Sequence, residues 1–342
     1  MNRPWLAPTI VLLALALATL SCARQSDEVI VYVAVDRSRA EPILRDFQEK
    51  CGTKVRAVYD TEAAKTTGLV ARLLSEADRP RCDVFWNNEA AQTCLLAQGG
   101  LLSEYESPAA RDIPDRFQPS SHLWTPVATR ARVIVYNTKH LALDEVPRSI
   151  FELADPKWRG KVAIANPQFG TTKTHVAVLY AVLGAQRAQE FLEELLANDV
   201  RIVDGNAMVK NLVARHSEAA GGVVIGLTDT DDVREGQAAG EPVDMVFPDQ
   251  ETMGTLLCPC TVCLVKDGPH PAAARCLMDY LVSQGVESKL CNQASGYMPV
   301  RAGAAGDGAE SLPDRRWFDV DDKQLLESLE ASSRWTLEHF HQ

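Results

Sequence analysis

The chain has 342 residues, with 46 acidic against 35 basic side chains and a formal net charge of −11. This balance argues against nucleic acid as a partner, because neutralising phosphates requires clustered lysine and arginine, and the sequence has no such stripe. The length is more than one compact core usually takes and suits two lobes.

The first residues predict export. One charged side chain, Arg3, precedes an apolar run at residues 10–20. This run is well short of the roughly 20 residues that a membrane-spanning helix needs, so it indicates a secretory signal. Ser21 followed by Cys22 resembles a bacterial lipoprotein processing site, although Thr19 stands where such sites usually carry an aliphatic residue. We expect a lipid on Cys22, with simple cleavage or a retained membrane anchor as the alternatives.

Short apolar strands alternate with amphipathic helices from residue 29 onward, which is typical of an α/β structure with a mostly parallel sheet. A β-branched run at residues 127–136 is long enough to cross between two lobes. A second alternation of strands and helices then predicts the other lobe. The predicted elements are strands 29–34, 54–59, 83–86, 162–165, 200–203 and 222–227, and helices 41–51, 69–74, 173–184, 188–197, 206–216 and 321–340.

Of the nine cysteines, eight lie beyond Cys22. In an oxidising compartment some should pair, but connectivity cannot be read from a sequence. Cys258, Cys260 and Cys263 lie close together, yet no second ligand pair stands at a zinc-finger spacing. The surrounding residues 255–265 form an apolar run typical of a buried strand. We therefore interpret these cysteines as buried thiols or a disulfide in preference to a zinc site.

Polar side chains follow each strand of the predicted first lobe, where ligands bind in open parallel sheets. The residues after the first strand serve equally well as solvated turn residues. Those after the second strand also supply ordinary helix N-caps. The third group, a carboxylate with two carboxamides, suits a metal ion or an amine, with helix capping as the alternative. The candidate residues are Asp36 and Arg37 after the first strand, Asp60, Thr61, Glu62 and Thr67 after the second, and Asn87, Asn88 and Glu89 after the third.

The predicted second lobe has two further polar groups. Residues 170–175 (GTTKTH) open a helix, and free N–H groups and hydroxyls there suit an anion such as phosphate, phosphonate or carbonate. Residues 228–232 (TDTDD) end a strand, and their three aspartates repel one another unless a positive ligand offsets them. Chance placement of the aspartates is the alternative. The candidates are Thr171, Thr172, Thr174, Thr228, Asp229, Thr230, Asp231 and Asp232.

Six segments carry a family resemblance: VIVYVAVDRSRAEPILRDFQEKCGTKV, CDVFWNNEAAQTCLLAQGGLL, ATRARVIVYN, ELADPKWRGKVAIANP, PHPAAARCLMDYLVS and QASGYMPVR. In this order and spacing they resemble the bacterial extracellular solute-binding proteins of the ferric-iron and related importer class. The resemblance implies two α/β lobes with a hinge, a periplasmic-binding-protein-like type II fold. We expect a signal peptide at 1–21, a first lobe from 22–130 and about 255–290, and a second from about 131–254 and 291–342.

The resemblance also implies that the protein captures a small solute and delivers it to the permease subunits of an ABC transporter. Ferric-binding members commonly carry adjacent tyrosines where this chain has residues 228–232. Carboxylates are also hard donors, so a metal would bind Glu89, where the family often has a metal-binding carboxylate, with Asp229, Asp231 and Asp232. The expected ligand is ferric iron, with or without an anion, or an organic zwitterion such as an aminoalkylphosphonate.

Enzyme function is the main competing class. The sequence has no Gly-x-Ser-x-Gly elbow, no His-Glu-x-x-His helix and no phosphate-binding Gly-x-x-x-x-Gly-Lys-Ser/Thr loop. Only His175 among the histidines falls in a predicted cleft segment, so we expect no catalytic residue and no catalytic cofactor. A surface adhesion or structural lipoprotein is a third class. We expect an exported monomer, in the periplasm or at the cell surface, held to the membrane by its lipid.

Overall fold

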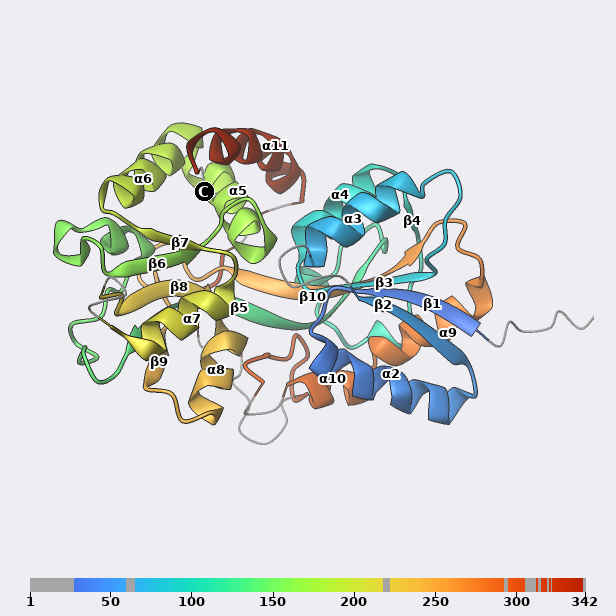
Figure 1. The fold of residues 1–342 in the computed structure, drawn as a ribbon. Coiled ribbons are helices and arrows are strands. Elements are labelled where there is room, and N and C mark those ends of the chain that lie inside the picture. The colour runs from blue at the N-terminus through green and yellow to red at the C-terminus, as the bar shows by residue number, and fades with distance from the viewer. Residues whose placement is uncertain are drawn as a thin grey trace, which may run out of the picture.

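The computed structural model describes residues 28–59, 65–217, 222–291, 295–304, 312, 315–318, 320 and 322–340 (Figure 1). Within these ranges, none of the helices combines the length and the apolar character that crossing a bilayer requires. The predicted signal and Cys22, as well as Asp60, Thr61 and Glu62, lie outside the described residues.

The first lobe is an α/β layer whose first three strands are parallel to one another. β1 pairs with β2 on one side and β3 on the other, with Glu28 opposite Lys54 and Val31 opposite Val84. Its elements are β1 (Glu28–Val33), α2 (Arg37–Cys51), β2 (Lys54–Tyr59), α3 (Lys65–Ser75), β3 (Val84–Asn87), α4 (Ala90–Gln98), β4 (Leu102–Ser103), α9 (Pro271–Leu281) and α10 (Gln284–Leu290), with 3₁₀ turns η1 (Pro108–Ala110) and η2 (Asp115–Phe117).

The second lobe repeats this layering with other helices. β6 lies between β7 and β8 and is parallel to both, which confirms the alternation predicted for this part of the chain. Its elements are η3 (Ile150–Ala154), η4 (Pro156–Trp158), β6 (Val162–Ala165), α5 (Gly170–Leu183), α6 (Ala185–Ala197), β7 (Arg201–Val203), α7 (Asn206–Arg215), β8 (Ile225–Asp229), α8 (Thr230–Ala238), β9 (Val243–Val246) and α11 (Asp322–His339).

Two long strands join the lobes, β5 (Thr125–Asn137) and β10 (Leu257–Val265) (Figure 1). β5 is buried along its whole length; it pairs antiparallel with β10 and then with β8 and β9. The strand order is therefore β2-β1-β3-β10-β5-β8-β6-β7. Both crossing strands are irregular near the same level: β10 shifts register between Pro259 and Thr261, and Ala128 of β5 has a φ of 59°. The expected crossing segment is thus present, although its strands are antiparallel.

Each lobe has its own core. Phe47 and Trp86 are fully buried in the first, while Trp158 and Phe191 pack in the second. Helix α11 lies over α5 of the second lobe (Figure 1). Tyr297, in the segment expected with the second lobe, instead packs in the core of the first. Residues that follow β1 and β3 line one cavity together with residues that follow β6 and β8, so the polar loops of both lobes meet there.

Candidate ligand-binding site

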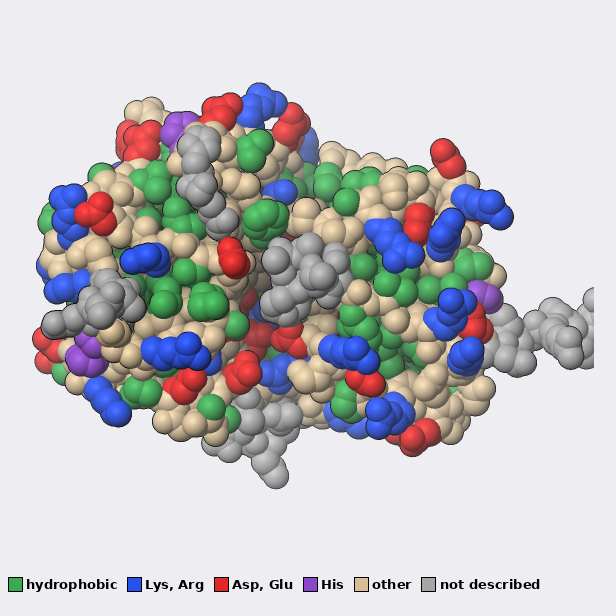
Figure 2. Space-filling view, in the orientation of Figure 1, with side chains coloured by type: hydrophobic (Ala, Val, Ile, Leu, Met, Phe, Trp, Pro, Cys, Tyr) green, Lys and Arg blue, Asp and Glu red, His purple; other side chains and the backbone are tan. Residues whose placement is uncertain are grey.

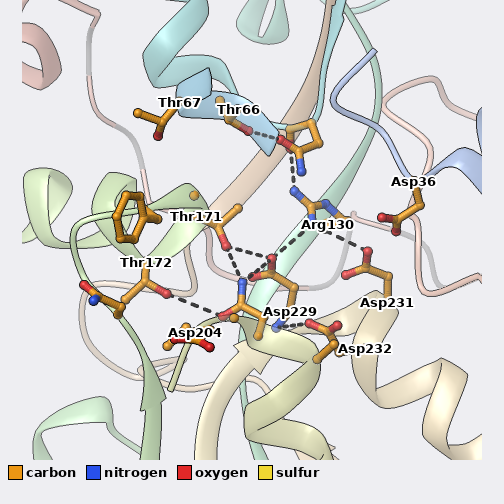
Figure 3. A pocket seen from close by; sticks show the side chains of 18 residues that line it. Asp36, Thr66, Thr67, Arg130, Thr171, Thr172, Asp204, Asp229, Asp231 and Asp232 are labelled. Atoms are coloured by element: carbon orange, nitrogen blue, oxygen red, sulfur yellow. Dashed lines mark hydrogen bonds and ion pairs between the residues drawn. The ribbon is translucent and has the colours of Figure 1, made fainter. Parts of the chain in front are cut away.

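A polar cavity of about 110 Å³ lies between the two lobes (Figure 3). Asp36, Thr66, Thr67 and Asn88 line it from the first lobe, and Figure 2 shows acidic side chains in the hollow between the lobes. The second lobe and strand β5 contribute the remaining lining, which includes Arg130, Thr171, Thr172, Asp204, Asn206, Asp229, Asp231 and Asp232. The cavity therefore lies where the strand-end rule predicted a ligand.

Several helices begin at this cavity. Thr66 and Thr67 lie in the first turn of α3, Gly170 begins α5, Asn206 begins α7, and Asp229 precedes α8. The first N–H groups of a helix have no partner within the helix and carry partial positive charge. Together these helix starts favour negative charge, either in the protein's own aspartates or in a ligand.

Two buried arginines, Arg130 and Arg132, cross the base of the site on β5. Arg130 Nη1 lies 3.0 Å from Asp229 Oδ2 and 3.5 Å from Asp231 Oδ2, and its Nη2 donates to the backbone carbonyl of Asn88 (Figure 3). Arg132 Nη1 lies 2.7 Å from Asp229 Oδ1. The sequence predicted that only a ligand would offset the aspartates. That expectation needs correction, because the protein itself supplies cations to Asp229.

The three aspartates accordingly differ in pKa and in hydrogen-bond partners. Burial opposes ionisation of Asp229, but Arg132 and Arg130 outweigh it and lower its pKa. Asp232 caps α8: its Oδ2 accepts from the Thr228 hydroxyl at 2.8 Å and from the backbone N–H of Asp229 at 3.4 Å. Burial, followed by repulsion from the other two aspartates, raises the pKa of Asp232.

Asp231 is the least satisfied member of the cluster. Its Oδ1 is buried and has no hydrogen-bond partner among the described residues. Burial raises the pKa of Asp231 to about 6, partly opposed by Arg130. One carboxylate oxygen from each of Asp229, Asp231 and Asp232 lies within 4.8 Å of the others. A cation at this point would therefore find oxygen donors already gathered.

Three other predicted site residues, and His175 from the predicted cleft segment, do not line this cavity. Arg37 turns to the surface, where it pairs with Glu41 at 3.0 Å. Asn87 donates to the backbone carbonyl of Glu89 at 2.7 Å and does not line the cavity. Thr230 Oγ1 donates to the Gly296 carbonyl at 2.7 Å. His175 is buried outside the cavity, and burial, reinforced by Arg132, lowers its pKa to about 3.

Glu89 is separated from the aspartate cluster. Its carboxylate caps α4 by accepting from the backbone N–H groups of Ala91 and Gln92, and it accepts from the Thr174 hydroxyl at 2.7 Å. Glu89 and Thr174 line a different, largely apolar cavity, with Trp124 and Phe318 among its other walls. Among the described residues, the carboxylates that gather within 4.8 Å of one another are those of Asp229, Asp231 and Asp232, without Glu89.

Sequence reasoning did not select Arg130, Arg132, Asp204 or Asn206 as site residues. Asp204 and Asn206 follow the predicted strand 200–203, so the same strand-end rule identifies them. Arg130 and Arg132 are two residues apart in an apolar strand, a spacing that places both side chains on one face. The lining residues that the structure describes include neither tyrosine nor histidine.

The chain is similar to bacterial solute-binding proteins over most of its length. The family model "Bacterial extracellular solute-binding protein" matches residues 89–324. Iron uptake protein A1 of Synechocystis is 26% identical over 82% of this chain and 77% of its own length. The Fe(3+)-binding periplasmic protein of Serratia marcescens is 22% identical, covering 83% of this chain and 81% of its own.

Solved structures match the fold over nearly its whole length. Iron-bound HitA from Pseudomonas aeruginosa has a TM-score of 0.80 at 21% identity, covering 90% of this chain and 99% of HitA. Apo ferric ion-binding protein A of Pasteurella haemolytica has a TM-score of 0.78 at 21% identity, with 92% and 98% covered. These matches confirm the predicted two-lobed, type II periplasmic-binding-protein fold.

Proposed function

This chain belongs to the family of bacterial extracellular solute-binding proteins, and from that premise we propose that it is the solute-binding component of an ABC importer. It captures a small solute in the cavity between its lobes and delivers it to the permease subunits. The observation that carries the proposal is the buried Oδ1 of Asp231. It has no hydrogen-bond partner among the described residues, and oxygens of Asp229 and Asp232 gather near Asp231 at the interlobe cavity. We also propose that it works as a monomer and without a catalytic cofactor.

Ferric iron is the first candidate cargo. Fe(III) prefers hard oxygen donors, which the three aspartates supply, and relatives carry names such as "Major ferric iron-binding protein" in Neisseria meningitidis. An anion accompanying the metal would be favoured by the helix starts at Gly170 and Asn206.

An organic zwitterion, such as an aminoalkylphosphonate, is the second candidate. Arg130 lines the cavity, and its Nε is buried without a partner among the described residues. A ligand with an ammonium group near Asp231 and a phosphonate near Arg130 would complement both charges. The absence of tyrosine from the described lining also supports this alternative.

Thermal unfolding of the purified protein with ferric citrate or 2-aminoethylphosphonate tests the proposal. A ligand that binds only the folded form stabilises it by RT ln(1 + [L]/Kd), about 2.7 kcal/mol at 100 times Kd. We expect one of the two to raise the melting temperature saturably, and citrate alone is the matched control for the first. If neither raises it, both cargo assignments are wrong.

We also propose that the exported protein is held to the membrane by a lipid on Cys22. Support comes from the short apolar run ending in Ser21 and Cys22. Replacing Cys22 with Ser should release the protein from membranes or block its processing. A Cys22→Ser variant that is processed and fractionates with membranes as before would contradict the anchor.

A further inference from the structure

Glu89 and Thr174 form a contact between the lobes that is separate from the ligand cavity. Glu89 precedes α4 of the first lobe and is fully buried, while Thr174 lies in α5 of the second lobe and is 7% exposed. The Thr174 hydroxyl donates to Glu89 Oε2 at 2.7 Å. Neither side chain lines the polar cavity. The pair therefore links the lobes without occupying the ligand's place.

The carboxylate of Glu89 is held rigidly by its own lobe. Oε2 accepts from the Ala91 N–H at 2.9 Å and Oε1 from the Gln92 N–H at 3.2 Å. A carboxylate fixed in this way presents its remaining lone pairs in a defined direction. Burying it is costly unless further donors reach it, and burial raises the pKa of Glu89, opposed by the hydrogen bond from Thr174.

The immediate neighbours of both residues connect this contact to the ligand cavity. Asn88, adjacent to Glu89, lines the cavity and accepts from Arg130 through its carbonyl. Thr171, one turn before Thr174, lines the cavity from the other lobe and donates to Asp229 Oδ2 at 2.8 Å. Movement of either helix start would thus change the cavity walls and the interlobe hydrogen bond together.

We propose that Glu89 and Thr174 form a closure latch, a hydrogen bond between the lobes that stabilises the closed arrangement without touching the ligand. The inference rests on the proposed function in that closure accompanies ligand capture. Separation of the lobes breaks the hydrogen bond from Thr174 and exposes the Glu89 carboxylate to solvent. The latch therefore favours the closed form, and ligand that binds the closed form gains affinity from it.

Small-angle X-ray scattering of Thr174→Val, with and without ferric citrate or 2-aminoethylphosphonate, tests the latch. This variant keeps the branched shape and removes only the hydroxyl. We expect a larger radius of gyration than wild type in at least one of these conditions, and ligand affinity weakened by about 10-fold. Glu89→Gln retains an acceptor and should show a smaller change. Combining the two should extend the protein no further than Thr174→Val alone.

Thr336→Val is the matched control, because the buried Thr336 hydroxyl donates within α11 to the Ser333 carbonyl at 3.1 Å. It should scatter like wild type. Identical scattering of Thr174→Val and wild type in every condition overturns the latch, as does equal expansion of the Thr336→Val control. If wild type binds neither compound while Thr174→Val is more extended, the cargo assignment fails and the latch stands.

Discussion

Asp231 differs from its neighbours in the aspartate cluster because its Oδ1 is buried without a partner among the described residues. Asp231→Asn should weaken ligand binding by roughly 1–3 kcal/mol, since a charge-assisted contact to the positive part of the ligand is lost. The stability of the ligand-free protein should stay equal or rise, because a buried charge near Asp229 is removed. Calorimetric titration and chemical denaturation measure the two effects.

The matched control is Asp199→Asn. Asp199 is an exposed aspartate that pairs with Arg159 on the surface of the second lobe at 2.7 Å. It should leave binding unchanged. If Asp231→Asn loses stability while its ligand affinity is intact, Asp231 is a structural residue of the α8 start and the assignment is wrong.

The pH dependence of binding follows from the pKa of Asp231, which burial raises to about 6. An aspartate in the unfolded chain has a pKa near 3.9. The raised pKa in the folded protein therefore contributes fully to the free energy of unfolding below about pH 4, and this contribution is lost as pH rises through about 6. A positive ligand needs the ionised carboxylate. Affinity should therefore rise between pH 5 and 7 and level off above.

Calorimetry across that range, with Asp231→Asn beside wild type, checks this dependence, because protonation of the ligand itself affects both proteins equally. The wild-type rise should be reduced in the variant. Parallel pH profiles for the two proteins would show that Asp231 does not govern binding.

At the level of single residues, the sequence identified the acidic loop but not its counter-ions. Asp229, Asp231 and Asp232 were found because strand ends form ligand sites in α/β folds. Arg130 and Arg132 lie in an apolar strand, and which face of that strand meets the cleft depends on how the two lobes are placed. Local spacing contains no information on that placement.

At the level of elements, Gly296 fixes the position of the α8 start. It has a φ of +67°, and a Cβ there would lie 2.5 Å from the Cα of Asp231. Gly296→Ala should cost about 1–3 kcal/mol of stability and weaken ligand binding, because backbone at Asp231 must shift. Chemical denaturation and calorimetric titration measure both.

Gly285→Ala in α10 is the control for this substitution. A Cβ at Gly285 meets nothing within 4 Å, and alanine favours helix over glycine by roughly 0.5–1 kcal/mol. This variant should be as stable as wild type or more so, with unchanged binding. Equal effects of the two substitutions would show that Gly296 does not fix the position of the α8 start.

Most elements were predictable from hydrophobic periodicity, and a few were not. Strands β1, β2 and β6 and helix α6 have clear apolar patterns and were found within a residue or a few of their bounds. Helix α8 was missed because only Val233 and a few small or polar residues form its buried face. Its start is stabilised by the Asp232 cap, a contact that a search for apolar spacing does not detect.

At the level of the whole molecule, length and the two alternations of strands and helices predicted two lobes, while the hinged type II arrangement and the return of the chain to the first lobe followed from the family resemblance. Periodicity predicts two runs of alternating strands and helices, but β10 and α9 return to the first lobe before α11 completes the second. Pairing between segments so distant in sequence depends on complementary surfaces that no local pattern encodes. The same limitation hid the contact between Glu89 and Thr174.

Scattering measured along a ligand titration tests the central claim, that a solute is bound between the lobes, most directly. The radius of gyration of the purified protein should fall as ferric citrate or 2-aminoethylphosphonate is added, because a ligand that contacts both lobes shifts the population toward the closed form. The fall should saturate at the concentration where calorimetric binding saturates. A ligand that saturates by calorimetry while the radius of gyration stays constant would contradict binding between the lobes.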